Sequence, residues 1–134
     1  MEFVWPIRVY YEDTDAGGVV FYANYLKFME RARTEWLRAF GFEQDRLMRE
    51  PGILFAVRRT EVDYLQSARF NDMLSVRSSV TEMRGASFTF EQHIVRDADG
   101  ELLCRGITKV ACIDAASMKP ARIPADIREK IQGP

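Results

Sequence analysis

The residues best suited to chemistry lie close together in residues 10–22, which read YYEDTDAGGVVFY. This segment contains three carboxylates, Glu12, Asp13 and Asp15, and leads into a stretch whose apolar residues recur at helical spacing. The first N–H groups of a helix have no internal acceptors, and the helix dipole adds partial positive charge there. A carbonyl oxygen at that end would be polarised, and an ionised carboxylate beside it would act as nucleophile or general base. Asp15 and the backbone N–H at Tyr22 are the candidates for this pair.

The same residues also suit a purely structural role, because Asp-Thr-Asp followed by Gly-Gly is ordinary turn and helix-capping chemistry. Other catalytic arrangements fit the sequence poorly. The glycines do not form a nucleotide-binding loop, since neither G-x-G-x-x-G nor a Walker G-K-[ST] is present. A Ser-His-Asp triad is also disfavoured, because the single histidine, His93, is expected on the solvent-facing side of a strand.

Further candidates for substrate contacts lie later in the chain. Arg58, Arg59 and Arg84 carry the charge that phosphate groups require. Ser87 follows Gly85 in a predicted turn and is a candidate for the same role. Each of these residues also fits an ordinary surface position, so the sequence leaves both interpretations open.

The spacing of apolar residues predicts the elements that must position these groups. A helical period runs over residues 22–40, and Gly41 is placed to end that helix. A short helix is expected at residues 123–131, and strands are expected at residues 5–11, 55–65, 74–80, 88–94 and 103–113. Consecutive strands form an antiparallel sheet, and an amphipathic helix must bury its apolar side against it. We therefore expect an α+β fold in which one antiparallel sheet wraps around one long central helix.

Length and composition exclude several classes of protein. The chain has 134 residues, which fits a single domain spanning 1–134. Lys plus Arg number 19 and Asp plus Glu number 20, so the net charge is −1 and no nucleic-acid partner is expected. The N-terminal residues do not read as a secretory signal, and no apolar run approaches the roughly 20 residues of a membrane span.

The cysteine content points to a reducing compartment. The two cysteines, Cys104 and Cys112, would lie roughly 26 Å apart on one extended strand, too far for a disulfide. Two free thiols favour the cytoplasm. With one histidine and no C-x-x-C pair, a structural zinc site is not expected, and the sequence calls for no cofactor.

Several segments are similar to one known family. Residues 8–20 (RVYYEDTDAGGVV), continued by ANYL at 23–26 and ERARTE at 30–35, closely resemble the hotdog-fold acyl-CoA thioesterases. The stretches MRGASF at 83–88 and MKPARIP at 118–124 are similar to the Tol-Pal-associated subgroup, the YbgC type. The likeness spans nearly the whole chain.

The resemblance implies a hotdog fold, in which the antiparallel sheet curls around the long helix. It also implies homodimers that pair through their sheets, commonly joined into homotetramers, with acyl-CoA bound at the dimer interface. The family's catalytic aspartate falls on Asp15, and its carbonyl-polarising backbone N–H falls on Tyr22. Many members of the subgroup carry histidine at the latter position, whereas the related 4-hydroxybenzoyl-CoA thioesterases carry tyrosine. The backbone N–H is present with either side chain, so its expected role does not depend on this difference.

These observations lead to the hypothesis of thioester hydrolysis without a metal or cofactor. Asp15 would either attack the carbonyl or activate a water, and the N–H at Tyr22 would hold the oxyanion. The alternative is a non-catalytic module that binds acyl thioesters, with acyl carrier protein or inner-membrane-associated proteins as partners and a location peripheral to the inner membrane. A hotdog dehydratase is less well supported, because such sites usually rely on a histidine.

Overall fold

The chain folds into one β-sheet, one long helix and several shorter helices. The computed structural model describes residues 2–132. No helix in this range is long and apolar enough to cross a membrane. In chain order the elements are β1 (Phe3–Arg8), the 3₁₀ helix η1 (Tyr11–Asp13), α1 (Ala23–Ala39), α2 (Gln44–Arg49), β2 (Ile53–Tyr64), β3 (Met73–Met83), β4 (Ser87–Arg96), β5 (Leu102–Asp114) and α3 (Ala125–Gln132).

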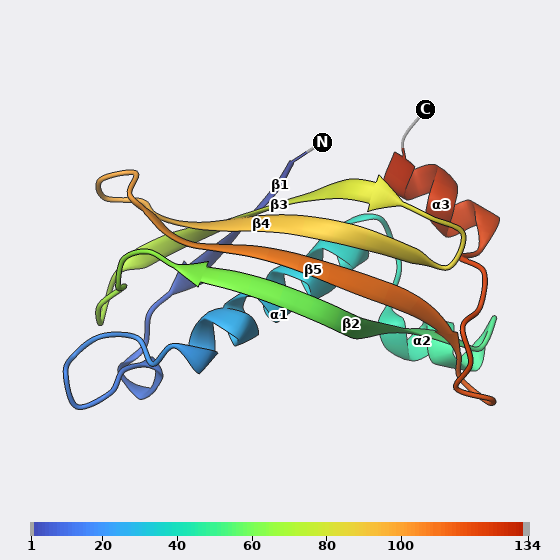
Figure 1. Cartoon of the computed structure of the whole chain (residues 1–134), viewed down its shortest axis with the longest axis horizontal. Helices are drawn as coiled ribbons and strands as arrows, with labels where there is room; N and C mark the ends of the chain where they lie inside the picture. The colour runs from blue at the N-terminus through green and yellow to red at the C-terminus, as the bar shows by residue number, and fades with distance from the viewer. Residues whose placement is uncertain (1, 133–134) are drawn as a thin grey trace.

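The strands pair in the order β1-β3-β4-β5-β2, and every pair is antiparallel. The long strands curve over α1, which runs along one face of the sheet (Figure 1). The loop before α1 lies at one end of the molecule, whereas α2 and α3 lie at the other end (Figure 1). The expected α+β fold, with one antiparallel sheet around a long helix, is therefore confirmed.

Strand β4 shows how the sheet gains one buried face. Phe88 and Phe90 are buried against Trp36 of α1, with ring centroids 5.9 and 4.8 Å from the indole centroid. Alternate residues, including Glu91 and His93, project from the opposite face. His93 is partly exposed, and its Nε2 lies 2.7 Å from a carboxylate oxygen of Glu91. The predicted solvent-facing position of His93 is confirmed.

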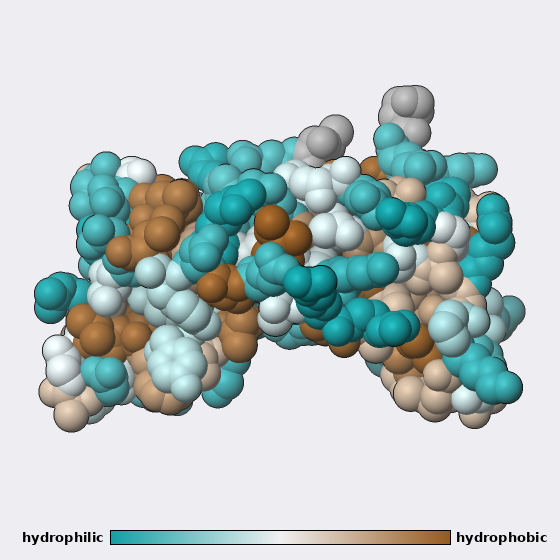
Figure 2. Space-filling model, viewed as in Figure 1, coloured by the Kyte–Doolittle hydropathy of each residue, from teal (hydrophilic) through white to brown (hydrophobic). Residues whose placement is uncertain are grey.

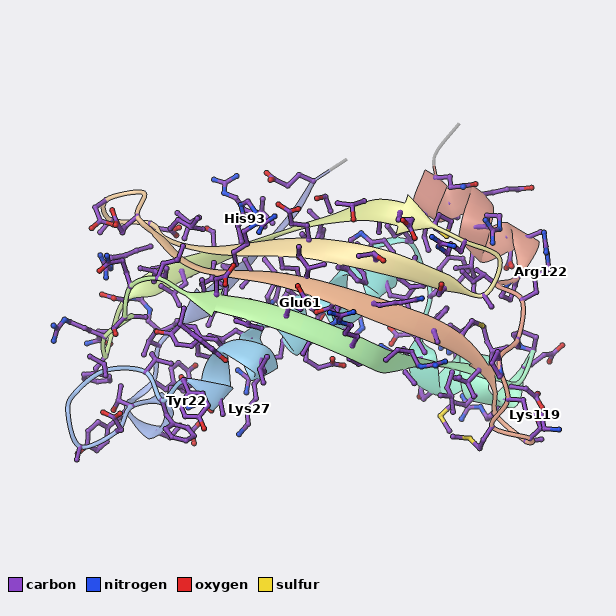
Figure 3. All side chains as sticks on the ribbon, viewed as in Figure 1. Tyr22, Lys27, Glu61, His93, Lys119 and Arg122 are labelled. Carbon is purple, nitrogen blue, oxygen red and sulfur yellow. The ribbon has the colours of Figure 1, made fainter. Side chains whose placement is uncertain are left out.

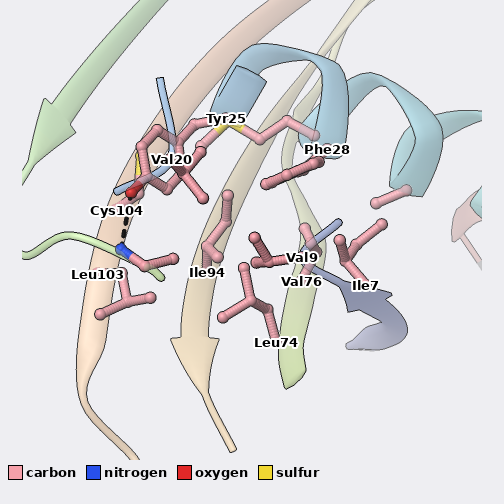
Figure 4. Close-up of a cluster of buried hydrophobic side chains, with 13 residues drawn as sticks. Ile7, Val9, Val20, Tyr25, Phe28, Leu74, Val76, Ile94, Leu103 and Cys104 are labelled. Carbon is pink, nitrogen blue, oxygen red and sulfur yellow. Dashed lines mark hydrogen bonds between the residues drawn. The ribbon is translucent and has the colours of Figure 1, made fainter. Parts of the chain in front are cut away.

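Helix α1 packs against the sheet through two clusters of buried side chains, one along each half of the helix. Figure 4 shows the cluster formed by the first half. The helix ends where the sequence predicts, because Gly41 adopts φ +94° and donates its N–H to the backbone oxygen of Arg38 at 2.9 Å. The buried residues of α1 are Tyr25, Phe28, Met29, Ala32, Trp36 and Leu37.

The close approach of α1 to β5 depends on Gly106. A β-carbon at this position would lie 2.7 Å from Sδ and 2.9 Å from Cε of Met29. Met29 is fully buried, so its side chain can move only by displacing other core groups. We expect Gly106→Ala to lower the free energy of unfolding by about 1–3 kcal/mol, the usual cost of overpacking a core.

Chemical denaturation followed by circular dichroism measures this loss. Gly85→Ala is the matched control, because a β-carbon there would lie 3.6 Å from its nearest neighbour, Nη1 of Arg122, which is ordinary van der Waals contact. A Gly106→Ala variant as stable as the wild type would contradict the tight contact between α1 and β5.

Some elements differ from the sequence-based expectation. The strand predicted at residues 5–11 is wrong at both ends, since β1 spans Phe3–Arg8. Val9 N–H still donates to the backbone oxygen of Asp72 at 2.9 Å, but Tyr10 N–H donates to Oδ2 of Asp13 at 2.8 Å, and the chain turns into η1 there. Helix α2 was not expected, because six residues are too few to display a helical period. The remaining predicted elements are confirmed with slightly different ends.

Both cysteines are buried on β5 and are free, as predicted. Burial raises the pKa of Cys104 to about 12, and the nearby Asp63 carboxylate adds to this shift. Burial also raises the pKa of Cys112. Both thiols are therefore protonated and shielded near neutral pH, so neither is a candidate nucleophile.

Candidate active site

The segment before α1 folds back on itself, which brings its acidic residues beside the start of the helix. Thr14 pairs with Val20 in an isolated antiparallel bridge. This bridge places residues 13–15 alongside residues 19–21. Helix α1 begins directly afterwards, so Asp13, Asp15 and the helix start belong to one small folded unit.

The two carboxylates of this unit have different surroundings. Asp13 is 9% exposed; its Oδ2 accepts the N–H of Tyr10 and its backbone oxygen accepts the side-chain amide of Asn24, both at 2.8 Å. Asp15 is exposed, and its Oδ1 accepts the N–H of Gly17 at 2.8 Å. No other hydrogen-bond donor within residues 2–132 reaches its carboxylate. Asp13 therefore holds the local fold, whereas Asp15 keeps an oxygen available for chemistry.

The first turn of α1 leaves backbone donors unused. Tyr22 is the N-cap residue, with φ −55°. The N–H of Asn24 donates to the backbone oxygen of Phe21 at 2.9 Å, and that of Tyr25 donates to Tyr22 O at 3.3 Å. The N–H groups of Tyr22 and Ala23 find no acceptor among the described residues. Because they lie at the positive end of the helix dipole, these groups are suited to hold a carbonyl oxygen or an oxyanion.

A hollow of about 150 Å³ opens beside Tyr22, and we call it the acyl hollow. It is lined by Val20, Tyr22, Tyr25 and residues 64–67, which comprise the end of β2 and the segment after it. Asp15 does not line the hollow. The residue before it, Thr14, pairs with the lining residue Val20.

Residues 64–67 were not among the predicted site residues. They are far from the acidic motif in sequence, and their one signal was the end of a predicted strand. Tertiary pairing attaches them to the motif: Val19 bridges to Arg69, and Val20 N–H donates to the backbone oxygen of Ala68 at 2.9 Å. No local pattern reveals such long-range bridges.

The tyrosines of the acyl hollow form a neutral, largely apolar wall. Tyr64 contacts Tyr22 and Tyr25, with ring centroids 6.0 and 5.7 Å apart. The Tyr25 hydroxyl oxygen accepts the N–H of Ala68 at 2.9 Å (Figure 4). Burial raises the pKa of Tyr25 and of Tyr64. Because phenols ordinarily titrate near pH 10, both side chains stay neutral at physiological pH.

A second hollow, of about 370 Å³, brings three of the four predicted substrate contacts together. Arg58, Arg59 and Ser87 line it with Lys109, and we call it the basic hollow. The register between β2 and β5 shifts between Val57 and Arg59, and this bulge adds Arg58 to the strand without a cross-strand partner. Two guanidinium groups, an ammonium group and a hydroxyl are suited to bind phosphate.

Arg84, the fourth predicted contact, does not line the basic hollow. Its Nε donates to a carboxylate oxygen of Glu82 at 2.5 Å, and this contact lowers the pKa of Glu82. Its backbone N–H donates to the backbone oxygen of Ser87 at 2.7 Å, so Arg84 lies at the turn beside the hollow. The described residues contain no group of three or more His, Cys, Asp or Glu side chains that could hold a metal ion.

The two hollows lie apart along the molecule. Figure 3 shows Tyr22, which lines the acyl hollow, at one end, and Lys119, the residue before Pro120 of the basic hollow, at the other. Along β2, the step from Arg59 to Tyr64 corresponds to about 16 Å of extended strand. Hydrophobic surface gathers at the end where α1 begins, and a hydrophilic band crosses the middle of the molecule (Figure 2). A ligand that used both hollows would need an anionic group and a reactive apolar group joined by a long arm.

Comparison with known proteins identifies similar sequences over almost the whole chain. Residues 9–131 match the model of the Thioesterase-like superfamily. The chain is 50% identical over 125 residues to the acyl-CoA thioester hydrolase YbgC of Escherichia coli O6:H1, covering 93% of this chain and 92% of that protein. It is 45% identical over 126 residues to the acyl-CoA thioesterase YbgC of Haemophilus influenzae, covering 94% and 91% of the two chains.

A solved structure shares the same arrangement of elements. A variant of 4-hydroxybenzoyl-CoA thioesterase, in complex with 4-hydroxybenzoyl-CoA, superposes with a TM-score of 0.90. The alignment covers 97% of this chain and 98% of that chain, with 20% sequence identity. At this level of identity the likeness concerns the fold alone.

Proposed function

The chain belongs to the Thioesterase-like superfamily and has the hotdog fold, and from that premise we propose that it hydrolyses acyl-CoA thioesters to a free acid and CoA. The observation that carries the proposal is that an exposed carboxylate and unused backbone donors belong to the same folded unit at the start of α1. Asp15 and the N–H of Tyr22 belong to one folded unit beside the acyl hollow. The basic hollow adds the charge that the phosphates of CoA require.

The chemistry that we propose needs only these groups. In one route the Asp15 carboxylate attacks the thioester carbon, the C–S bond breaks and CoA leaves as a thiolate. Water then hydrolyses the resulting mixed anhydride and restores the carboxylate. In the other route Asp15 takes a proton from a water that attacks the same carbon directly. In both routes the N–H of Tyr22 donates to the carbonyl oxygen as negative charge develops on it.

An acyl-CoA panel tests this function. Short, long and aromatic acyl-CoAs are incubated with the protein, and the released CoA is followed with a thiol-reactive chromogen. The buried Cys104 and Cys112 should not contribute to the signal. We expect turnover of at least one of the three classes. Flat traces with all three would instead favour a module that binds acyl thioesters or acyl carrier protein without hydrolysing them.

We propose that the basic hollow binds the phosphates of CoA through Arg58, Arg59 and Ser87, with Arg84 at its margin. Arg58→Ala and Lys109→Ala should each raise KM, and the inhibition constant of free CoA, by about two- to fivefold. Exposed ion pairs contribute little each, so larger single effects are not expected. Because kcat depends on groups elsewhere, it should not change.

Steady-state kinetics at two ionic strengths checks this prediction. The loss should shrink at high salt, where the wild-type contacts are already screened. Arg49→Ala is the control, since Arg49 is an exposed arginine on α2 that does not line the basic hollow. Unchanged affinity for free CoA in both the Arg58 and Lys109 variants would place the phosphates elsewhere.

We further propose that the chain works in the cytoplasm as a homodimer or homotetramer, peripheral to the inner membrane. The buried free thiols support a reducing compartment. Strand β2 ends the sheet, and an edge strand is a surface on which a second copy pairs readily. Acyl carrier protein and inner-membrane-associated proteins, including those of the Tol-Pal system, are proposed partners on the resemblance alone. Light scattering of the purified protein tests the oligomeric state.

A further inference from the structure

We infer that two successive side chains of α1, Asn24 and Tyr25, are positioning residues for the hydrolysis. Their hydrogen bonds fix the backbone that carries Asp15 relative to the N–H of Tyr22. This inference rests on the proposed thioesterase function and adds two residues to its machinery. Neither side chain touches the reacting atoms, because each acts only through the backbone.

The side chain of Asp15 has little of its own to fix its position. It is exposed, and the N–H of Gly17, two residues away, is the one hydrogen-bond donor that reaches it within residues 2–132. That bond lies inside the turn and moves with it. The place of the carboxylate relative to α1 therefore depends on how the backbone of residues 13–21 is attached to the helix.

Asn24 makes the first attachment. Its side-chain amide donates to the backbone oxygen of Asp13 at 2.8 Å, and the N–H of Phe21 donates to the same oxygen at 3.0 Å. One carbonyl group thus accepts donors from both sides of Tyr22 in the sequence. Residues 13–15, which include Asp15, are therefore fixed directly to the first turn of α1.

Tyr25 makes the second attachment, on the other side of residues 19–21. Its hydroxyl oxygen accepts the N–H of Ala68 at 2.9 Å (Figure 4), and the backbone oxygen of Ala68 accepts the N–H of Val20 at 2.9 Å. Tyr25, Ala68 and Val20 are 3%, 0% and 4% exposed. Because these groups are buried, water does not replace a lost partner, and an unpaired donor there is costly.

The second attachment closes a ring around the proposed oxyanion donors. The chain runs from Val20 through Tyr22 and Ala23 to Tyr25, and the Tyr25 side chain returns to Val20 through both backbone polar groups of Ala68. Every one of these bonds joins two groups of the same chain, so the ring does not depend on a second copy. Opening it frees the first turn of α1 to shift relative to the motif.

Tyr25→Phe removes only the hydroxyl and leaves the N–H of Ala68 buried without an acceptor. We expect kcat to fall by about tenfold, because a displacement of roughly 1 Å from the productive geometry costs as much as about 10²-fold. Asn24→Ala should lower kcat by a similar factor. KM should change by less than about twofold in both variants, the pattern of a loss confined to the transition state.

A double-mutant cycle with Asp15→Asn separates positioning from general damage. Without the carboxylate there is no catalytic group for Tyr25 to place. In the Asp15→Asn background, Tyr25→Phe should therefore change kcat by less than about twofold, against about tenfold in the wild type. The same factor of loss in both backgrounds would overturn the inference.

Two further variants control for loss of a hydroxyl and for loss of stability. Tyr11→Phe removes the hydroxyl of a tyrosine in the same segment that is 79% exposed, and it should not change kcat. Ile127→Val opens space around a fully buried side chain of α3, at the other end of the molecule (Figure 1). It should lower the melting temperature without changing kcat. A tenfold loss of kcat in Ile127→Val would assign the effect of Tyr25→Phe to lost stability and overturn the inference.

Hydrogen exchange followed by NMR measures the attachment without any substrate. In Tyr25→Phe the amides of Ala68 and Val20 should exchange about tenfold faster than in the wild type, while the amides of α3 should not change. Unchanged exchange at Ala68 and Val20 would overturn the inference and leave the thioesterase function standing. A wild type that hydrolyses no acyl-CoA would overturn the proposed function, and the inference with it, whatever the exchange rates show.

Discussion

Replacing Asp15 with asparagine is expected to lower kcat for acyl-CoA hydrolysis by about 10²–10⁴-fold, the usual contribution of a positioned general base or nucleophile. An amide carries no negative charge, so it can neither attack the thioester carbon nor accept a proton from water. The fold should not change, because asparagine retains the Oδ1 atom that accepts the N–H of Gly17. Thiol release under saturating acyl-CoA measures the loss, and a thermal melt checks the fold.

Glu12→Gln is the matched control for this substitution. Glu12 is an exposed carboxylate three residues earlier in the same segment, and its neutralisation removes one negative charge from the same region. The control should hydrolyse acyl-CoA at nearly the wild-type rate. Near-wild-type kcat in Asp15→Asn would show that another group performs the chemistry, whatever the control does.

The second large effect should come from removing one backbone donor. Tyr22 has φ −55°, which proline adopts without strain, and proline has no N–H. Tyr22→Pro and Tyr22→Ala both lose the phenol ring, but only the proline variant loses the hydrogen-bond donor. We expect kcat of Tyr22→Pro to lie about 10²–10³-fold below that of Tyr22→Ala, the cost of deleting one oxyanion donor.

The kcat values of the two variants are compared with each other rather than with the wild type. Because both variants lack the phenol ring, the difference between them reports only the loss of the N–H. Both should melt at similar temperatures, because no described acceptor binds the N–H of Tyr22 in the folded chain. Equal kcat values in two well-folded variants would show that the N–H of Tyr22 does not hold the oxyanion. In that case the neighbouring N–H of Ala23 becomes the donor to test.

The sequence predicted elements with strong internal periodicity and missed features set by tertiary contacts. Helix α1 was predicted almost to the residue, because its apolar face repeats over several turns and Gly41 ends it. The first strand was misplaced because the 3₁₀ helix η1, held by the bond from Tyr10 N–H to Oδ2 of Asp13, takes the chain out of the sheet where the alternating pattern continues. Helix α2 is too short to carry a pattern of its own.

The same distinction holds for the candidate site. Asp15 and Tyr22 are close in sequence, so one local motif contains both of them. Tyr64 reaches the acyl hollow only because the segment after β2 bridges back to the motif, and Lys109 reaches the basic hollow only through the pairing of β2 with β5. Sequence alone also gave no sign that Arg84 pairs with its near neighbour instead of lining that hollow.

A crystal structure of the Asp15→Asn variant with an uncleaved acyl-CoA tests the central claim most directly. We predict that the thioester oxygen lies about 2.7–3.1 Å from the backbone nitrogen of Tyr22. The side chain at position 15 should lie within about 3.5 Å of the thioester carbon, or one bridging water away from it. A thioester bound away from the first turn of α1, with neither group in reach, would contradict the account.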